Sequence, residues 1–347
     1  MTPALRIISP GLSTTIQDVG RSGFQRLGVS VSGALDPVSL HAANALAGNP
    51  GNTGVLEALY VGPTFAVDTD DTRLAFAGAD AAIEILDNAD PRGGEIIPTM
   101  QSVHVRRGQV IRVGSLKNGA TLYIAVEGGF AVAPALGSVS TDSRGRMGGW
   151  QGRPLVEGDV IPLRRATATE RDEYRIDDLD LAAPRRFRAV LGPQNDNFSD
   201  QEIERFFASE YTVSAGSNRM GMRLEGQAIR HVRGFNIVSD AIATGSIQVP
   251  GSGQPIVLLA DHQTTGGYPK IATVISADLP ALGRLPIGSQ VFFAPITVEE
   301  AAAARRELCA TVDGIAGRMV RLAVPAAAVA ARLLECNLIS GVQDAAA

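Results

Sequence analysis

A polar, glycine-rich segment, residues 261–270, is the part of the chain best equipped for chemistry. It lies between two apolar runs that are typical of buried strands, so it has the layout of a binding loop on a rigid scaffold. Its hydroxyls, amide, backbone N–H groups, aromatic ring and charges belong to Asp261, Gln263, Thr264, Thr265, Gly266, Gly267, Tyr268 and Lys270. Such groups can hold a phosphate or a carboxylate. An ordinary hairpin stays open as an alternative, because Gly-Gly and Tyr-Pro are common turn dipeptides.

The cation in this segment is unusual for the chain. Of 31 basic residues, only Lys117 and Lys270 are lysines, so arginine is used wherever a generic positive charge suffices. A lysine that is kept in such a background indicates a need for a flexible ammonium group. Lys117 lies in a turn-like Ser-Leu-Lys-Asn-Gly stretch, whereas Lys270 follows the glycine-rich loop. We therefore predict that Lys270 contacts an anion.

A second polar segment, residues 13–24, carries Gln17, Asp18 and Arg21 among serines, threonines and glycines. Its glycines would let backbone N–H groups approach an anion, which predicts the rim of a ligand site. The alternative is a hydrogen-bonded turn system in which Asp18 pairs with Arg21 and the hydroxyls cap the backbone.

Three shorter segments complete the candidate site. Gln194 follows a strand-like run, and Asn218 and Arg219 lie in a Gly/Ser-rich loop, where a guanidinium suits capture of a carboxylate or phosphate. Gln248 and Gln254 flank the turn before the strand-like run 256–259. Each segment also has a plain structural reading, as a loop before a capped helix, a surface arginine or a turn.

Several common active sites are excluded by spacing. The loop 261–270 lacks the GxxxxGK[ST] order of a phosphate-binding loop, and no Ser-His-Asp or Cys-His order is present. The two cysteines and four histidines lie far apart from one another, so no metal-ligand set is predicted.

Short strands dominate the rest of the chain. The expected strands are rich in Val, Ile and Leu and are bounded by Gly, Pro, Asn or Asp; they are 5–8, 55–59, 74–77, 110–113, 122–126, 187–191, 256–259, 271–275 and 291–294. Helices are few and begin at recognisable caps; they are expected after Asp36, after Ser199, after Thr297 and from Pro325 to Glu335.

The spacing of these elements favours a mainly β protein, β-rich α+β, with barrels or sandwiches and a few short helices. The charged, weakly periodic stretch 167–184 predicts a seam between two β-rich domains. We expect an N-terminal domain over 1–170, a barrel domain over 185–296, and a C-terminal helical extension over 297–347 that packs on the body.

Composition excludes some classes of protein. The net charge is −5 without a basic tract, which argues against a nucleic-acid partner. No apolar run approaches the ~20 residues that span a bilayer. The N-terminus is not typical of a secretory signal, so a cytoplasmic location and no membrane contact are expected.

The quoted segments resemble one known family. GLSTTIQDVGRSGFQRLGVSVSGALD, YIAVEGGFAVAPALGSVSTD, SNRMGMRLEG and SDAIATGSIQVPGSGQPIVLLADHQTTGGYPKIATVISAD look like the ordered motifs of the biotin-dependent carboxyltransferase-like family, also known as allophanate hydrolase subunit 2 or urea amidolyase-related proteins. The resemblance extends from about Ile8 to Phe293. Family patterns often have other residues where this chain has Leu35, Ser252 and His262; an arginine is usual at position 262, which puts any role of that position in doubt.

The resemblance implies a cyclophilin-like β-barrel architecture and a partner chain. Members act in three settings: as the C subunit of bacterial 5-oxoprolinase, together with the B subunit and a separate A subunit; as a carboxyltransferase component of urea amidolyase; and as a regulator that antagonises a kinase inhibitor. The first is the function we expect. It would use ATP with Mg²⁺, because phosphorylation of an amide oxygen makes the carbon a better electrophile and the oxygen a better leaving group.

In that setting, Arg219 and Lys270 would contact anionic oxygens and Asp261 would orient the substrate or Mg²⁺. Biotin is implied only if another chain carries it, because this chain has no Met-Lys pair. The prediction depends on one geometric condition: the side chains of Lys270 and Arg219 must line the same cavity.

Overall fold

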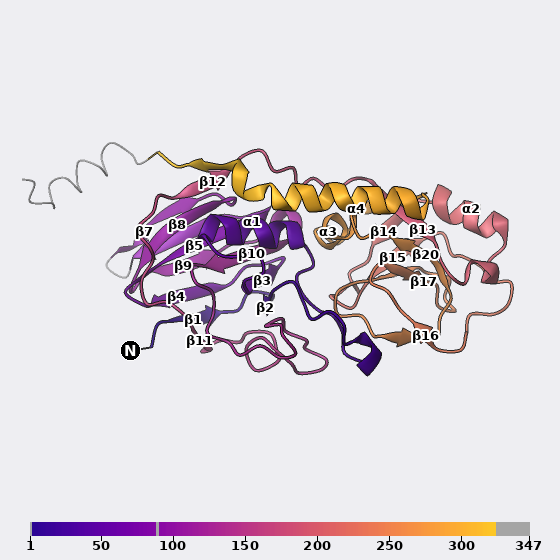
Figure 1. The fold of residues 1–347 in the computed structure, drawn as a ribbon, viewed down its shortest axis with the longest axis horizontal. Coiled ribbons are helices and arrows are strands. Elements are labelled where there is room, and N and C mark those ends of the chain that lie inside the picture. Colours follow the sequence, from indigo (N-terminus) through magenta and orange to yellow (C-terminus); the bar gives the residue numbers. More distant parts are fainter. Residues whose placement is uncertain (1, 88–89, 324–347) are drawn as a thin grey trace, which may run out of the picture.

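The computed structural model describes residues 2–87 and 90–323, and nothing is said of the side chains of residues 90–93. The described chain forms two lobes joined side by side (Figure 1). The expectation of a β-rich fold with few helices and a barrel is confirmed. None of the described helices is long and apolar enough to cross a membrane.

The first lobe, called here the sandwich lobe, packs two sheets face to face. In spatial order, one sheet contains β11 (Val160–Pro162), β1 (Ala4–Ser9), β4 (Thr64–Asp68), β9 (Val110–Val113), β6 (Ile83–Asp87) and β7 (Asp90–Ile97). The other contains β2 (Ser13–Gln17), β3 (Val55–Leu59), β10 (Lys117–Val126), β5 (Asp71–Asp80), β8 (Gln101–Arg106), β12 (Tyr174–Ile176) and β22 (Met319–Arg321).

Side chains that point alternately to the two faces of a strand allow one sheet to pack against the other sheet and also against a helix, which makes a third layer. In β10, Leu122 and Ile124 pack in the core between the sheets, whereas Tyr123 and Ala125 pack on the other side, against helix α1 (Pro37–Ala47). Side chains of a strand point alternately to its two faces, so one strand supplies both cores. The sheet containing β10 is therefore buried on both faces.

The second lobe, the barrel lobe, is a closed barrel with its own apolar core. Its strands, in order around the barrel, are β13 (Arg186–Leu191), β20 (Lys270–Val274), β17 (Ser246–Gln248), β18 (Ile256–Leu258), β15 (Gly221–Gly226), β14 (Tyr211–Val213) and β21 (Gln290–Pro295). Strands β13 and β21 close it in parallel, from Arg186 opposite Phe292 to Ala189 opposite Pro295. A two-stranded ladder, β16 (Asp240–Ala241) with β19 (Thr265–Gly266), lies outside the barrel.

The helices begin where the sequence caps predict. The Asp36 carboxylate accepts hydrogen bonds from the N–H groups of Val38 and Ser39, and Gly48 ends α1 in the left-handed conformation. Ser199 caps α2 (Asp200–Ala208), and Thr297 and Glu300 form a capping box at the start of α4 (Val298–Asp313). The remaining short helices are α3 (Leu279–Gly283), η1 (Gln25–Leu27), η2 (Asn195–Asn197) and η3 (Ile315–Arg318).

Two connections differ from the simple plan of successive domains. Strand β12 lies inside the predicted seam and beyond residue 170, yet it pairs with β8 and β22 in the sandwich lobe. After the barrel, α4 runs alongside both lobes, and the chain returns to the sandwich lobe as β22 (Figure 1). The extension after residue 296 therefore contains a strand as well as a helix. The helix expected from Pro325 to Glu335 lies outside the described residues.

Candidate functional site

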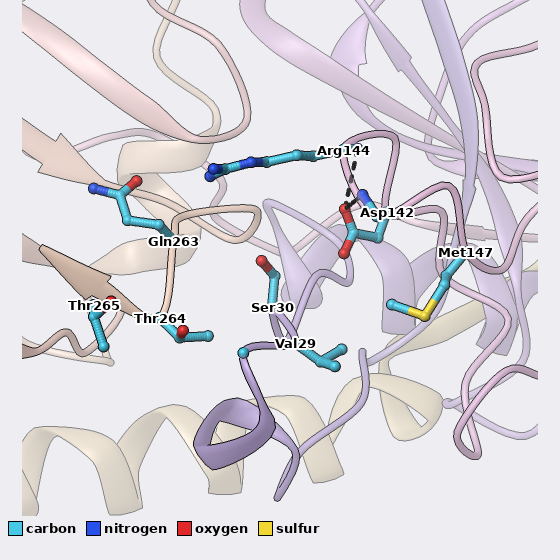
Figure 2. A pocket seen from close by; sticks show the side chains of 10 residues that line it. Val29, Ser30, Asp142, Arg144, Met147, Gln263, Thr264 and Thr265 are labelled. Atoms are coloured by element: carbon cyan, nitrogen blue, oxygen red, sulfur yellow. Dashed lines mark hydrogen bonds between the residues drawn. The ribbon is translucent and has the colours of Figure 1, made fainter.

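The junction of the two lobes contains two neighbouring cavities. The first, called here the polar cavity, has a volume of ≈ 580 Å³. The sandwich lobe contributes Ser30, Asp142 and Arg144 to its wall, and the barrel lobe contributes Gln263, Thr264 and Thr265 (Figure 2). Three residues of the predicted binding loop therefore do line a cavity.

The second, called here the apolar cavity, has a volume of ≈ 370 Å³. Most of its wall is apolar, including Leu12, Leu35, Leu59, Met222, Leu259 and Leu285. Asn218, Arg219 and Asp261 also lie on this wall, and Arg144 lines both cavities. Asn218 is engaged with its own turn, because its side-chain oxygen accepts from the N–H groups of Met220 and Gly221.

Arg219 connects the lobes through a buried ion-pair network. Its guanidinium pairs with Asp261 of the same lobe, at 2.8 Å, and with Glu57 of strand β3 in the sandwich lobe. It also donates to the carbonyl oxygen of Gly33 at 2.6 Å. A second pair, Arg284 with Asp36 at 2.9 Å, crosses the same junction.

The neighbours of Arg219 in this network keep its guanidinium charged. Burial alone would lower the pKa of Arg219, but the adjacent carboxylates of Asp261 and Glu57 raise it above the ordinary arginine value. Tyr123 donates its hydroxyl proton to Glu57 at 2.7 Å, and burial raises the pKa of that hydroxyl well above its usual range. Arg219 is thus a permanent, fully compensated charge.

Arg144 is a charged cavity residue that the sequence analysis missed, as it missed Ser30 and Asp142. Its loop is held by Asp142, whose carboxylate oxygen accepts from the N–H groups of Arg144 at 3.1 Å and Gly145 at 2.9 Å. Backbone hydrogen bonds between Asp142 and Met147 close the turn. The sequence signal was present as Asp-Ser-Arg-Gly, an Asx-type turn that displays an arginine.

In the polar segment 13–24, Gln17, Asp18 and Arg21 are buried and line neither cavity, although Ser13 lies in the wall of the apolar cavity. Asp18 accepts from the hydroxyls of Ser138 and Ser140, at 2.6 and 2.5 Å. Arg21, which is 1% exposed, donates to the carbonyl oxygens of Ala135 and Ser140. Asp18 and Arg21 therefore meet through the segment 135–140, and the turn-system alternative describes them better than a ligand rim.

Gln17 belongs to the same network. It is fully buried, and its amide nitrogen donates to the Thr15 hydroxyl at 3.0 Å and the Thr141 carbonyl at 3.2 Å. Its amide oxygen has no partner among the described residues. Segment 13–21 thus supports the stretch that leads into the Arg144 turn.

Lys270 forms a different network on the barrel. Its ammonium donates to the Asp240 carboxylate at 2.7 Å and the Ala241 carbonyl at 3.0 Å. Gln194 joins the same carboxylate at 3.0 Å and accepts from the Lys270 backbone N–H at 3.3 Å. The hydrogen bond from Lys270, followed by that from Gln194, holds the pKa of Asp240 below its usual value.

This network fixes the outer ladder that follows the binding loop. Gly266 pairs with Asp240 in the β16–β19 ladder, and the Gly267 carbonyl accepts from Ile237 at 2.9 Å. Tyr268 is 40% exposed and is outside both cavity linings. At the positions where anion-binding N–H groups were predicted, Gly266 therefore pairs in the ladder and Gly267 accepts a backbone hydrogen bond beside it.

The two remaining glutamines lie apart from each other. Gln254 binds the backbone N–H and carbonyl of Gly226, at 3.0 and 3.2 Å. Gln248 is 2% exposed, and its amide nitrogen has no partner among the described residues. A Cβ built on Gly266 would lie 2.6 Å from that nitrogen, so Gly266 gives the Gln248 amide its room.

The expected convergence of Lys270 and Arg219 is therefore wrong. Arg219 forms ion pairs with carboxylates at the lobe junction, and Lys270 forms an ion pair with Asp240 outside both cavities. Each buried cation has a carboxylate in direct contact, which is how a folded chain compensates the loss of hydration. A sequence pattern shows the cation but not its partner.

His262, where the family pattern often has arginine, is a buried residue. Its ring nitrogens contact the Gln263 carbonyl at 2.6 Å and the Thr244 hydroxyl at 3.1 Å, and burial lowers its pKa. The His262 carbonyl accepts from the Ser30 hydroxyl at 2.9 Å across the junction. The residue thus shapes the wall of the polar cavity without facing into it.

Within the described residues, no group of three or more His, Cys, Asp or Glu side chains is placed to hold a metal ion. The sequence analysis predicted no metal-ligand set for all 347 residues, whereas this structural finding applies to residues 2–87 and 90–323. The carboxylates in the two cavity linings are Asp142, which accepts backbone N–H groups, and Asp261, which pairs with Arg219.

Comparison with known proteins places these features in a family. Residues 27–295 match the family described as carboxyltransferase domain, subdomain A and B. The chain is 37% identical over 315 residues to the 5-oxoprolinase C subunit of Escherichia coli, covering 91% of this chain and 98% of that protein. It is 38% identical over 296 residues to the 5-oxoprolinase C subunit of Haemophilus influenzae, covering 84% of this chain and 91% of that protein.

A solved structure has the same architecture. The crystal structure of the Kluyveromyces lactis urea carboxylase superimposes with a TM-score of 0.83 at 28% identity. The match covers 94% of this chain and 31% of that one, so the two lobes correspond to under a third of the larger protein.

Proposed function

The chain belongs to the carboxyltransferase domain family, subdomain A and B, and from that membership we propose that it is the C subunit of an ATP-dependent 5-oxoprolinase. One observation carries the proposal: the chain matches 98% of the Escherichia coli protein of that name at 37% identity. In contrast, it matches only 31% of the urea carboxylase chain.

We place the substrate in the polar cavity. Ser30, Thr264 and Thr265 offer hydroxyls and Gln263 offers an amide, which can pair with the C=O and N–H of a cyclic amide. Since the wall comes from both lobes, the cavity depends on the ion pairs that join them. In this proposal Arg219 and Asp261 are positioning residues. Gln17, Asp18 and Arg21 stabilise the segment that leads into the Arg144 turn.

The charged residues in the two cavity linings are Arg144, Arg219, Asp142 and Asp261. Lys270, the lysine expected to contact phosphate, is paired with Asp240, and the described carboxylates form no metal cluster. Triphosphate sites need several cations or N–H donors and a metal. We therefore propose that the nucleotide binds with groups from another chain of the complex, and that this chain binds and orients the amide.

Partners follow from the same proposal. The relatives are named as C subunits, which implies that they have companion chains, and we propose a complex with a B subunit, and cooperation with an A subunit, in the cytoplasm. The exposed side of the junction, where Leu12 is 67% exposed beside the apolar cavity, is available for such contact.

The test is reconstitution. The chain is purified with its B and A subunits, and release of ADP, phosphate and glutamate is measured with and without 5-oxoproline. We expect turnover only when this chain and 5-oxoproline are both present. Omission of this chain is the control. Equal turnover without the chain, or turnover only with urea and a biotin carrier, would contradict the proposal.

A further inference from the structure

Arg144 is presented to the junction from a rigid base. The Asp142 carboxylate fixes the backbone of its turn, and Asp142 itself is only 4% exposed. The Arg144 side chain is exposed and extends across the polar cavity towards Gln263 (Figure 2). A fixed backbone with an extended side chain places the guanidinium at the boundary of both cavities.

The guanidinium of Arg144 has no side-chain or carbonyl partner among the described residues. This separates it from Arg219, the other cation in the two linings, which contacts two carboxylates and a carbonyl. Asp142, which is the acidic residue in the polar lining, also acts on the buried Arg21, raising its pKa against the larger lowering by burial. Of the two arginines in the cavity linings, Arg144 is therefore the one whose guanidinium has no partner among the described residues.

The opposite wall consists of neutral hydrogen-bonding groups. Gln263, Thr264 and Thr265 can satisfy an amide but carry no charge. A ligand that fills both sets of contacts therefore needs a neutral amide at one end and an anion at the other. A guanidinium binds a carboxylate through two parallel hydrogen bonds, a geometry that a neutral ligand cannot match.

We propose that Arg144 binds the carboxylate of the substrate, and so selects a carboxylate-bearing cyclic amide over a neutral amide such as urea. This inference rests on the proposed function, because it assumes that the amide occupies the polar cavity. It makes Arg144 a specificity-determining residue. It also gives a chemical reason why one two-lobed architecture could serve both charged and uncharged amides.

The first experiment compares two ligands that differ by one group. 5-Oxoproline and 2-pyrrolidinone have the same lactam ring, and only the first has a carboxylate. Binding of each is measured by calorimetry to the full chain and to its complex with the B subunit. We expect the wild type to bind 5-oxoproline about 10- to 100-fold more tightly, as a charge-assisted pair predicts.

The second experiment removes the charge. Arg144→Gln should abolish the preference for 5-oxoproline and leave 2-pyrrolidinone binding unchanged, and Arg144→Lys should restore part of it. The matched control is Arg146→Gln, which changes the same charge on the same turn at a residue outside both cavity linings. In the reconstituted complex, Arg144→Gln should raise KM for 5-oxoproline more than it lowers kcat.

The outcomes separate this inference from the proposed function. No preference in the wild type, a preference that survives Arg144→Gln, or an equal loss in Arg146→Gln would overturn the role of Arg144. Weaker binding of ATP or inorganic phosphate in Arg144→Gln, with 5-oxoproline unaffected, would overturn it too. A wild-type complex that prefers 5-oxoproline through Arg144 but hydrolyses no ATP would refute the function and support the inference.

Discussion

The Arg219 network and the Arg144 turn lie on the wall of one cavity and use the same side chain in opposite ways. Arg219 has a side chain 10% exposed and spans two lobes through Glu57 and Asp261. Arg144 is exposed and has no guanidinium partner among the described residues. A buried guanidinium loses its hydration and needs a carboxylate within the fold, whereas an exposed guanidinium stays hydrated until a ligand binds it.

This comparison teaches how to separate structural from functional charges. Lys270 falls between the two cases, because it is 2% exposed but its partner Asp240 is 48% exposed. Substitutions at the three positions should therefore have graded effects on stability, and the gradient can be tested in order.

The largest effect is expected at Arg219. Arg219→Met leaves the carboxylate of Glu57, which is fully buried, and that of Asp261 without their cation, so the free energy of unfolding should fall by about 3–5 kcal/mol. Urea denaturation measures it. Arg223→Met, at an exposed position on the next strand, is the control and should change stability by less than about 0.5 kcal/mol. Equal losses in the two variants would break the comparison.

A smaller effect is expected at Lys270. In Lys270→Met the Asp240 carboxylate can turn to water, so the free energy of unfolding should fall by less than in Arg219→Met, and amide exchange in β16 and β19 should accelerate. Lys117→Met, at the other, exposed lysine, is the matched control.

The same pair predicts a dependence on pH. The pKa of Asp240 is lowered from 3.8, so its stabilisation is complete above that value and is lost as the pH falls through the lowered pKa. Lys270→Met should therefore weaken the acid dependence of unfolding. If the free energy of unfolding of Lys270→Met falls at low pH as steeply as that of the wild type, the Lys270–Asp240 pair does not exist in solution.

The smallest effect on stability is expected at Arg144. Since its guanidinium makes no hydrogen bond or ion pair with a described residue, Arg144→Gln should leave the free energy of unfolding within about 0.5 kcal/mol of the wild type. This is the sharpest form of the comparison, because the same variant is expected to lose ligand selectivity. A loss of about 2 kcal/mol or more would show that Arg144 is structural after all.

Local signals in the sequence predicted local structure well. Asp36, Ser199 and Thr297 each cap a helix, as expected from their spacing to the following residues. Because a cap involves residues two or three positions apart, the sequence contains the whole interaction. The apolar runs were likewise strands, because β-branched and aliphatic residues between turn formers leave few alternatives.

Long-range partners were not predictable from one sequence. Lys270 and Arg219 were recognised as special, but their carboxylates are 30 residues away, at Asp240, and 162 away, at Glu57. Strand β12 is only three residues long and lies in a charged stretch, and its partner β22 follows the whole barrel lobe in the sequence. Arg144 was overlooked among many arginines because nothing local shows which one lacks a partner.

The return of the chain to the sandwich lobe at β22 has a consequence for biosynthesis. Tyr174–Ile176 and Met319–Arg321 pair strand to strand, with the whole barrel inserted between them in the sequence. During translation the first lobe must therefore wait, with the outer side of β12 uncovered, until the second lobe has been synthesised. A ribosome stalled before residue 319 should therefore hold a first lobe that is more protease-sensitive than the released chain, because β22 is not yet available to pair with β12.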